Sequence, residues 1–126
     1  MQLNQVTVSV TDIERSVSFY KLLGLQLIVH SPHYARFIVK GNNATFSIHI
    51  ADEVKPSQTV VYFECDDVDV THEDLMAKGI NFESEPVDQT WLWREAYCKD
   101  PDGNLLCLYH AGENRLNPPW RITDSL

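Results

Sequence analysis

Residues 97–110 read Tyr-Cys-Lys-Asp-Pro-Asp-Gly-Asn-Leu-Leu-Cys-Leu-Tyr-His, a pattern typical of two strands joined by a tight turn. Pro101 fixes φ for the second position of the turn, and Gly103 permits the positive φ that closes it. Asp100 and Asp102 can accept hydrogen bonds from downstream amides, which favours the turn before the strands pair. We therefore expect a β-hairpin with one face that lines either a core or a binding pocket.

The first half of the chain predicts a strand, a helix and three more strands. Polar and apolar residues alternate over 3–10, and apolar residues then recur at helical spacing from Ile13 to Leu23. Thr11 and Glu14 are spaced as a capping box at the start of this helix, and Gly24 is suited to ending it. The three further strands are expected over 25–31, 34–40 and 44–50.

The second half repeats this order after a shift of 55 residues, which places Asp12 on Asp67 and Gly24 on Gly79. It predicts a strand over 59–65, a helix over 68–78 and a strand over 80–84, then an insertion over 85–92 before strands at about 93–99 and 105–110. A single repeat of this length indicates two copies of one supersecondary unit, not a solenoid.

We therefore expect one domain over 1–126, with module one at about 1–54, module two at about 57–110 and a C-terminal docking tail over 111–126. Two adjacent prolines, Pro118 and Pro119, argue against helix in the tail. Trp120 is expected to anchor the tail to the body or to a second subunit.

The charge and the cysteines limit the functional classes. A net charge of −8 argues against nucleic acid or an anionic membrane as a partner and favours a cationic ligand, or only aids solubility. Neither a signal peptide nor a membrane-spanning run is expected. Three cysteines without CxxC spacing favour a reducing compartment, so we expect a cytoplasmic protein.

The order of modules and motifs resembles the vicinal oxygen chelate superfamily, which includes glyoxalase I, extradiol dioxygenases, fosfomycin-resistance enzymes and bleomycin-resistance proteins. The resemblance covers about residues 3–110 and rests on Asp-Ile-Glu-Arg-Ser-Val-Ser-Phe-Tyr at 12–20, Leu-Gly-Leu at 23–25 and Asp-Pro-Asp-Gly-Asn at 100–104. It implies an α+β fold of two tandem βαβββ modules whose curved sheets enclose a pocket, as in glyoxalase and bleomycin-resistance proteins. It also implies a homodimer.

Metal-using members of the superfamily carry four ligands, whose positions fall here on Gln5, Ser47, Val60 and Cys107. Val60 has no donor atom and Ser47 is a poor neutral ligand, so an amide and a thiol would remain. We therefore expect no metal cofactor. The alternative is a divalent metal in a shifted site, where Gln5, His49, Glu64 and Cys107 would converge.

Without a metal, aromatic and polar side chains would have to hold a ligand. The candidate ligand-binding residues are Ser47, His49, Tyr62, Glu64, Trp93, Glu95, Tyr97 and Cys107. An acidic, aromatic cavity suits a cationic or planar molecule, although aromatic residues on strands also form cores and dimer interfaces. Glu64 or Glu95 would serve as a general base if burial raised its pKa, or is simply a solvated carboxylate. Cys107 is expected to be an inert buried thiol.

Three hypotheses follow for the function. The first is a metal-free protein that binds a small organic molecule, possessing the superfamily pocket and sequestering a cationic or aromatic compound. The second is a metal-dependent lyase, isomerase or dioxygenase with a rearranged site. The third is a non-catalytic interaction subunit. The sequence identifies no catalytic residue for any of them.

Overall fold

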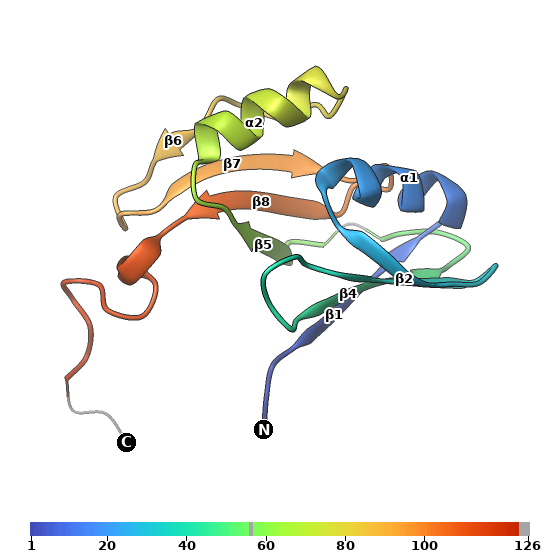
Figure 1. The fold of residues 1–126 in the computed structure, drawn as a ribbon, viewed down its shortest axis with the longest axis horizontal. Helices are drawn as coiled ribbons and strands as arrows, with labels where there is room; N and C mark the ends of the chain where they lie inside the picture. Colours follow the sequence, from blue (N-terminus) through green and yellow to red (C-terminus); the bar gives the residue numbers. More distant parts are fainter. Residues whose placement is uncertain (56, 124–126) are drawn as a thin grey trace.

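The protein is described here from a computed structural model that covers residues 1–55 and 57–123. Over these residues the chain forms eight strands, two α-helices and one short 3₁₀ helix (Figure 1). The elements are β1 (Gln5–Val10), α1 (Ile13–Leu23), β2 (Gln26–His30), β3 (Tyr34–Ile38), β4 (Thr45–Ile50), β5 (Val60–Glu64), α2 (Val68–Ala77), β6 (Val87–Asp88), β7 (Arg94–Lys99), β8 (Leu105–His110) and η1 (Gly112–Asn114). None of the helices described is long and apolar enough to cross a membrane.

The strands form two four-stranded sheets with the same topology. The first has the order β1-β4-β3-β2 and the second the order β5-β8-β7-β6. In each sheet the first strand runs parallel to the last strand of its module, and the remaining pairs are antiparallel. Figure 1 shows α1 over the first sheet and α2 over β7 and β8. The predicted α+β fold of two βαβββ modules is confirmed.

Both helices begin at an aspartate. Asp12 accepts a hydrogen bond from the amide of Arg15 at 3.0 Å, and Asp67 accepts one from the amide of Val70 at 3.1 Å. The predicted capping box of Thr11 and Glu14 is therefore wrong by one residue. The reason is that the Thr11 hydroxyl donates to a carboxylate of module two and is not available to its own helix.

The fourth strand of the second sheet lies in the segment predicted as an insertion. The predicted strand over 80–84 is wrong, because only Phe82 forms an isolated bridge, with Cys98. The edge position is taken instead by β6, whose Val87 pairs with Glu95. Two residues are too few for an alternating pattern, so nothing in the sequence indicates this strand.

The modules share one hydrophobic core between the sheets and the helices. Tyr20 of α1 packs on Phe37 and Phe46 of the first sheet, with ring centroids at 5.8 and 4.6 Å. Phe46 in turn contacts Phe63 of the second sheet at 5.8 Å, edge to face. Because this core crosses from one module to the other, neither half buries its apolar surface alone.

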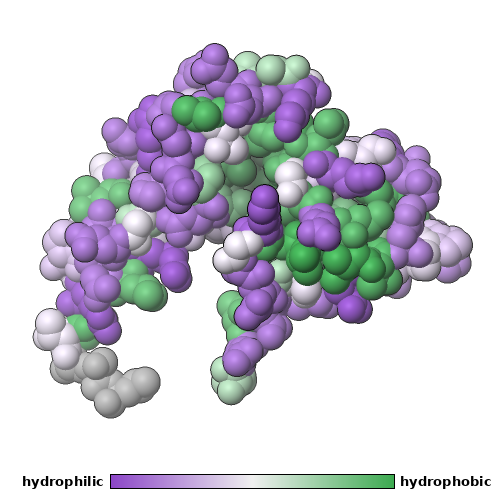
Figure 2. Space-filling model, in the orientation of Figure 1, coloured by the Kyte–Doolittle hydropathy of each residue, from purple (hydrophilic) through white to green (hydrophobic). Residues whose placement is uncertain are grey.

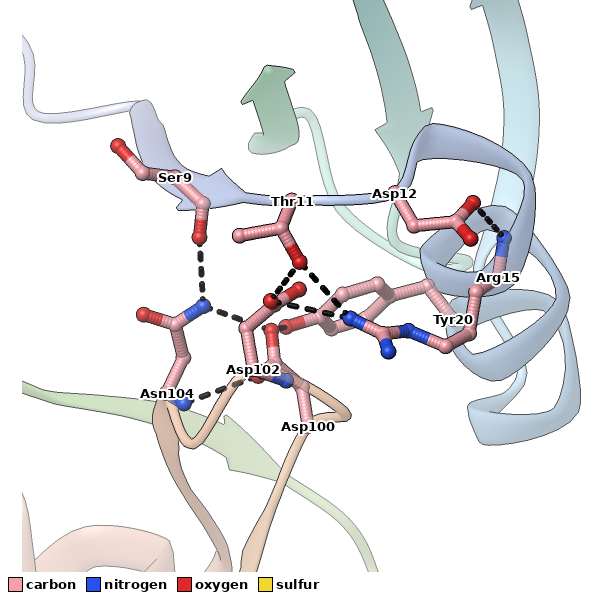
Figure 3. A network of polar contacts seen from close by, with 8 residues as sticks. All are labelled: Ser9, Thr11, Asp12, Arg15, Tyr20, Asp100, Asp102 and Asn104. Carbon is pink, nitrogen blue, oxygen red and sulfur yellow. Dashed lines mark hydrogen bonds and ion pairs between the residues drawn. The ribbon is translucent and has the colours of Figure 1, made fainter. Parts of the chain in front are cut away.

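The turn between β7 and β8 also joins the modules (Figure 3). Asp100 is buried, accepts the backbone amides of Asp102 and Asn104 at 2.9 Å, and receives the hydroxyl of Tyr20 at 2.7 Å. Burial, followed by the charge of Asp100, raises the pKa of Tyr20, so its phenol remains a donor. The predicted turn is present, with Gly103 at φ 87°.

A second set of contacts surrounds the other aspartate of this turn. Asp102 accepts the Thr11 hydroxyl at 2.6 Å and Arg15 Nη2 at 3.0 Å, while the side-chain amide of Asn104 donates to the carbonyl of Ser9 at 2.9 Å (Figure 3). The end of β1 and the start of α1 are thereby fixed to the second module. The turn therefore sets how the two sheets lie relative to one another.

Candidate functional site

Each sheet has one face that packs on the core and on α1 or α2, and an opposite face that neither of these two helices covers. We call the uncovered face of the first sheet the polar face; it carries Gln5, Thr7, Tyr34, Arg36, Thr45, Ser47 and His49. We call the uncovered face of the second sheet the aromatic face; it carries Tyr62, Glu64, Trp93, Glu95, Tyr97, Cys107 and Tyr109. Ser47 and His49 thus lie on one face and the other six predicted ligand residues on the other.

Three rings form the centre of the aromatic face. Trp93 stacks on Tyr109 with centroids 4.7 Å apart, and Tyr62 meets both rings edge to face at 5.8 and 5.4 Å. The Tyr62 side chain remains exposed, with 42% of its surface accessible, and Trp93 is partly exposed. Tyr109 itself is buried, so Tyr62 and Trp93 present the aromatic surface of this face, in a fixed arrangement that is suitable for stacking on a planar molecule.

A carboxylate lies beside these rings, since Glu95 of β7 pairs with Tyr109 of β8. Glu95 is 2% exposed and accepts hydrogen bonds from Trp91 Nε1 at 3.0 Å and from the Tyr97 hydroxyl at 3.1 Å. Burial, and then the hydrogen bond with Tyr62, raise the pKa of Tyr97, so its phenol stays protonated. The face thus combines aromatic rings with a buried acidic group, the combination expected for a cation site.

Cys107 occupies the middle of β8 on the same face and is fully buried. Burial, followed by the charge of Glu95, raises the pKa of this thiol to about 12. The thiol is therefore mostly protonated at neutral pH, which makes it a poor nucleophile. The expectation of an inert thiol stays a prediction.

Glu64 is directed to the start of the tail. Its Oε2 accepts the backbone amides of Ala111 at 2.8 Å and Gly112 at 3.0 Å, and Arg115 Nε lies 3.9 Å from its Oε1. Burial favours a higher pKa, but the two amides and the nearby charges of His110 and Arg115 outweigh it and lower the pKa of Glu64. The raised pKa that a general base would need is thus not found at Glu64, whose carboxylate instead contacts the start of the tail.

The polar face contains two residues that the sequence reasoning missed. Tyr34 and Arg36 lie on β3, directly beside His49 and Ser47 of β4. Arg36 Nε donates to the Tyr34 hydroxyl at 2.8 Å, and that hydroxyl lies 2.7 Å from Ser47 Oγ. Alternation along 34–38 was the available signal, since it places Tyr34 and Arg36 on one face of a strand next to the predicted Ser47.

The donors at the four positions carried over from metal-using relatives do not suit a divalent metal. Val60 has none, the Cys107 thiol is protonated, and Ser47 Oγ is engaged by Tyr34. Gln5 Oε1 already accepts the Thr45 hydroxyl at 2.5 Å. Over residues 1–55 and 57–123, no three His, Cys, Asp or Glu side chains are grouped closely enough to hold a metal ion.

A groove of about 670 Å³ runs along the seam between the modules. It is lined by β1, by residues of the 53–61 segment and by the hairpin turn, including Lys99 and Asp102. The predicted ligand residues lie outside it, on the two uncovered faces. The structure therefore has three regions, a polar face, an aromatic face and a seam, and Thr7 belongs to both the polar face and the seam.

The family model of the Glyoxalase/Bleomycin resistance protein/Dioxygenase superfamily matches residues 2–108. An uncharacterized Bacillus subtilis protein, YraH, is 34% identical, with 86% of this chain and 98% of that protein aligned. A probable trivalent organoarsenical cleaving enzyme of Bacillus subtilis is 30% identical, with 90% of this chain and 83% of the enzyme aligned.

Solved structures share the fold at lower identity. A glyoxalase/bleomycin resistance protein/dioxygenase from Nocardioides has a TM-score of 0.78 at 24% identity, covering 98% of this chain and 90% of that one. A bleomycin resistance determinant encoded on a transposon has a TM-score of 0.73 at 19% identity, covering 87% of this chain and 98% of that one. This chain belongs to the Glyoxalase/Bleomycin resistance protein/Dioxygenase superfamily.

Proposed function

We propose that this protein is a metal-free member of its superfamily that binds a small, planar and cationic organic molecule on its aromatic face. The observation that carries the proposal is the stacked and edge-to-face arrangement of Tyr62, Trp93 and Tyr109 on an uncovered sheet face. Fixed rings lose little conformational entropy when a planar ligand stacks on them.

Electrostatics favour a cation on this face. The buried carboxylate of Glu95 accepts a hydrogen bond from Tyr97, and the whole chain carries a net charge of −8. Aromatic faces attract cations through their quadrupole, and an excess of acidic groups adds to that attraction over a longer range. Since Val60 has no donor atom and Cys107 is a fully buried thiol, we expect the ligand to be held without a metal.

A homodimer is part of the proposal. Leu116, Trp120 and Ile122 of the tail are 63%, 57% and 75% exposed, and Figure 2 shows open space between the tail and the N-terminal segment. Trp120 thus does not anchor the tail to its own body, and a second subunit would cover these apolar side chains. Light scattering after gel filtration should give twice the monomer mass.

A cytoplasmic location stays a prediction from the cysteine pattern.

A thermal-shift screen of chelator-treated protein tests the binding role. A ligand at 100 times its dissociation constant should add about 2.7 kcal/mol to the free energy of unfolding. We expect planar cations to raise the melting temperature and matched planar anions to raise it less. No shift from any compound class would favour the non-catalytic interaction subunit instead.

Elemental analysis of protein purified without chelator tests the metal-free part. We expect nickel, zinc, iron and manganese all far below one atom per chain. A near-stoichiometric metal that is lost in Gln5→Ala or His49→Ala would overturn this part and would support the alternative enzyme with a rearranged site.

The second candidate function is cleavage of a trivalent organoarsenical, favoured by the identity of 30% to the Bacillus subtilis enzyme over 90% of this chain. Trivalent arsenic is a soft centre that prefers thiolates. Cys98 and Cys107 point to opposite faces of their sheet, and burial raises the pKa of each thiol to about 12. These two cysteines therefore do not form a ready dithiolate, and we place this function second.

A turnover assay separates the two functions. Purified protein, supplied with each divalent metal in turn, should leave a trivalent aryl-arsenical intact under reducing conditions. Release of inorganic arsenic at many turnovers per chain would establish the second function and displace the first.

A further inference from the structure

The polar face carries an arginine whose orientation is set by the protein. Arg36 lies in β3, a central strand that pairs with β2 and β4 on its two sides. Its Nε–H donates to the Tyr34 hydroxyl at 2.8 Å, and its guanidinium carbon lies 5.4 Å from the centre of the Tyr34 ring. The Nε edge of the guanidinium is thus held against the sheet by Tyr34.

A fully buried hydroxyl supports this arrangement. Ser47 Oγ lies 2.7 Å from the Tyr34 hydroxyl, and the Ser47 side chain is 0% exposed. Burial favours a higher pKa of Tyr34, but the hydrogen bonds of Ser47 and Arg36 outweigh it and lower the pKa. The phenol oxygen is therefore a good acceptor for Arg36 Nε and keeps the guanidinium in place.

The two terminal nitrogens of Arg36 differ from those of other arginines in the chain. Arg15, Arg94 and Arg115 each lie within 4.0 Å of a carboxylate. Across residues 1–55 and 57–123, Arg36 has neither an ion pair nor a hydrogen bond from Nη1 or Nη2. Although the chain has 18 acidic residues, the described residues thus provide no carboxylate partner for this guanidinium, which the sheet orients.

We propose that the polar face binds the carboxylate of a small organic acid, through the two terminal nitrogens of Arg36. The end of a guanidinium offers two parallel N–H donors that match the two oxygens of a planar carboxylate. His49 lies directly beside Tyr34 in the next strand and is exposed, so it can add a donor at the edge of the site. The residues of this site lie on the first sheet, whereas the aromatic face belongs to the second, and the site prefers the opposite ligand charge.

Calorimetric titration with sodium benzoate, at ionic strength held constant with chloride, tests the proposal. We expect saturable binding at one benzoate per chain, and a loss of affinity of about tenfold or more in Arg36→Gln. Arg121→Gln is the matched control, since it removes the same charge from the exposed tail and should bind as the wild type does. Equal binding by Arg36→Gln and wild type, or no saturation in the wild type, would overturn the proposal.

Two further variants keep the test decisive if Arg36→Gln does not fold. Arg36→Lys retains the charge but loses the parallel donors, so benzoate should bind several-fold more weakly than to wild type. Tyr34→Phe leaves the guanidinium intact but frees it, and should also weaken binding several-fold. Wild-type affinity in both variants would overturn the proposed role of this face.

The choice of ligand is tested in the same way. Inorganic phosphate should compete with benzoate only weakly, and competition at equal or better affinity would overturn the assignment to a carboxylate. Trp93→Leu on the aromatic face should leave benzoate binding unchanged. A failure of this site is thereby distinguishable from a failure of the function proposed for the aromatic face.

Discussion

The two modules share their framework but differ in their uncovered faces. Asp12 and Asp67 cap equivalent helices, and Gly24 and Gly79 occupy equivalent positive-φ positions at 111° and 99°. The faces opposite the helices have diverged. One carries an oriented arginine among hydroxyl groups, and the other carries stacked aromatic rings over a buried carboxylate.

This difference separates residues that maintain the fold from residues that give the protein its chemistry. Framework positions repeat at an interval of 55 residues because both modules need the same helix starts and ends. The uncovered faces are under no such constraint, since a side chain there contacts solvent or a ligand. Function in this superfamily member is therefore expected where the repeat breaks down.

The largest effect is expected at a framework position without a counterpart in module one. Asp100→Ala should lower the free energy of unfolding by about 3 kcal/mol, because it leaves the Tyr20 hydroxyl and the amides of Asp102 and Asn104 without their acceptor. Urea denaturation measures the change. Asp52→Ala, at an exposed position, is the control and should leave the midpoint unchanged. A midpoint for Asp100→Ala close to that control would show that the turn does not join the modules.

The two helix caps test whether the frameworks are equivalent. Asp12→Ala and Asp67→Ala should each cost about 1 kcal/mol, because each removes the acceptor of one amide in a first helical turn. The decrease in the free energy of unfolding of the double variant should equal the sum of the two single decreases, since the caps belong to different helices. Thermal and urea unfolding measure all three. A loss of unfolding free energy in Asp12→Ala several times that in Asp67→Ala would show that the two frameworks are not equivalent.

A smaller effect is expected at Glu64, as a dependence of stability on pH. The folded state holds the pKa of Glu64 below its ordinary value of 4.5, so its contribution is present above that pH and is lost as the pH falls through the lowered pKa. Glu64→Gln should lose less stability than either cap variant at pH 7, and the difference from wild type should shrink below about pH 4. Urea midpoints at pH 3 to 7 measure it. A difference between the urea midpoints of wild type and Glu64→Gln that grows as the pH falls would contradict this assignment.

The sequence predicted the framework well because its signals are local. Asp100-Pro101-Asp102-Gly103 sets a turn through the torsion preferences of its own residues, and the repeat places both helices. The contacts that these residues make were harder to predict from the sequence. The bond from Thr11 to Asp102 spans 91 positions, and nothing near Thr11 in the sequence indicates that its hydroxyl leaves the helix cap.

The candidate site was predictable only in part. Strand alternation grouped Tyr62, Glu95 and Tyr97 on one face, where the structure places them. The same alternation was available for Tyr34 and Arg36, but neither falls on a position that metal-using relatives employ. The orientation of the Glu64 side chain could not be predicted either, since its partners Ala111 and Gly112 lie in the tail, 47 and 48 positions away.

The central claim is that the aromatic face binds a planar cation without a metal. The most direct test is calorimetric titration of chelator-treated protein with N-methylquinolinium, comparing wild type with Trp93→Leu and Trp120→Leu. We expect saturable binding by wild type and Trp120→Leu, and affinity lower by about tenfold in Trp93→Leu, because it loses the stacked indole. Binding that appears only after a divalent metal is added, or that is equal in Trp93→Leu and wild type, would contradict the account.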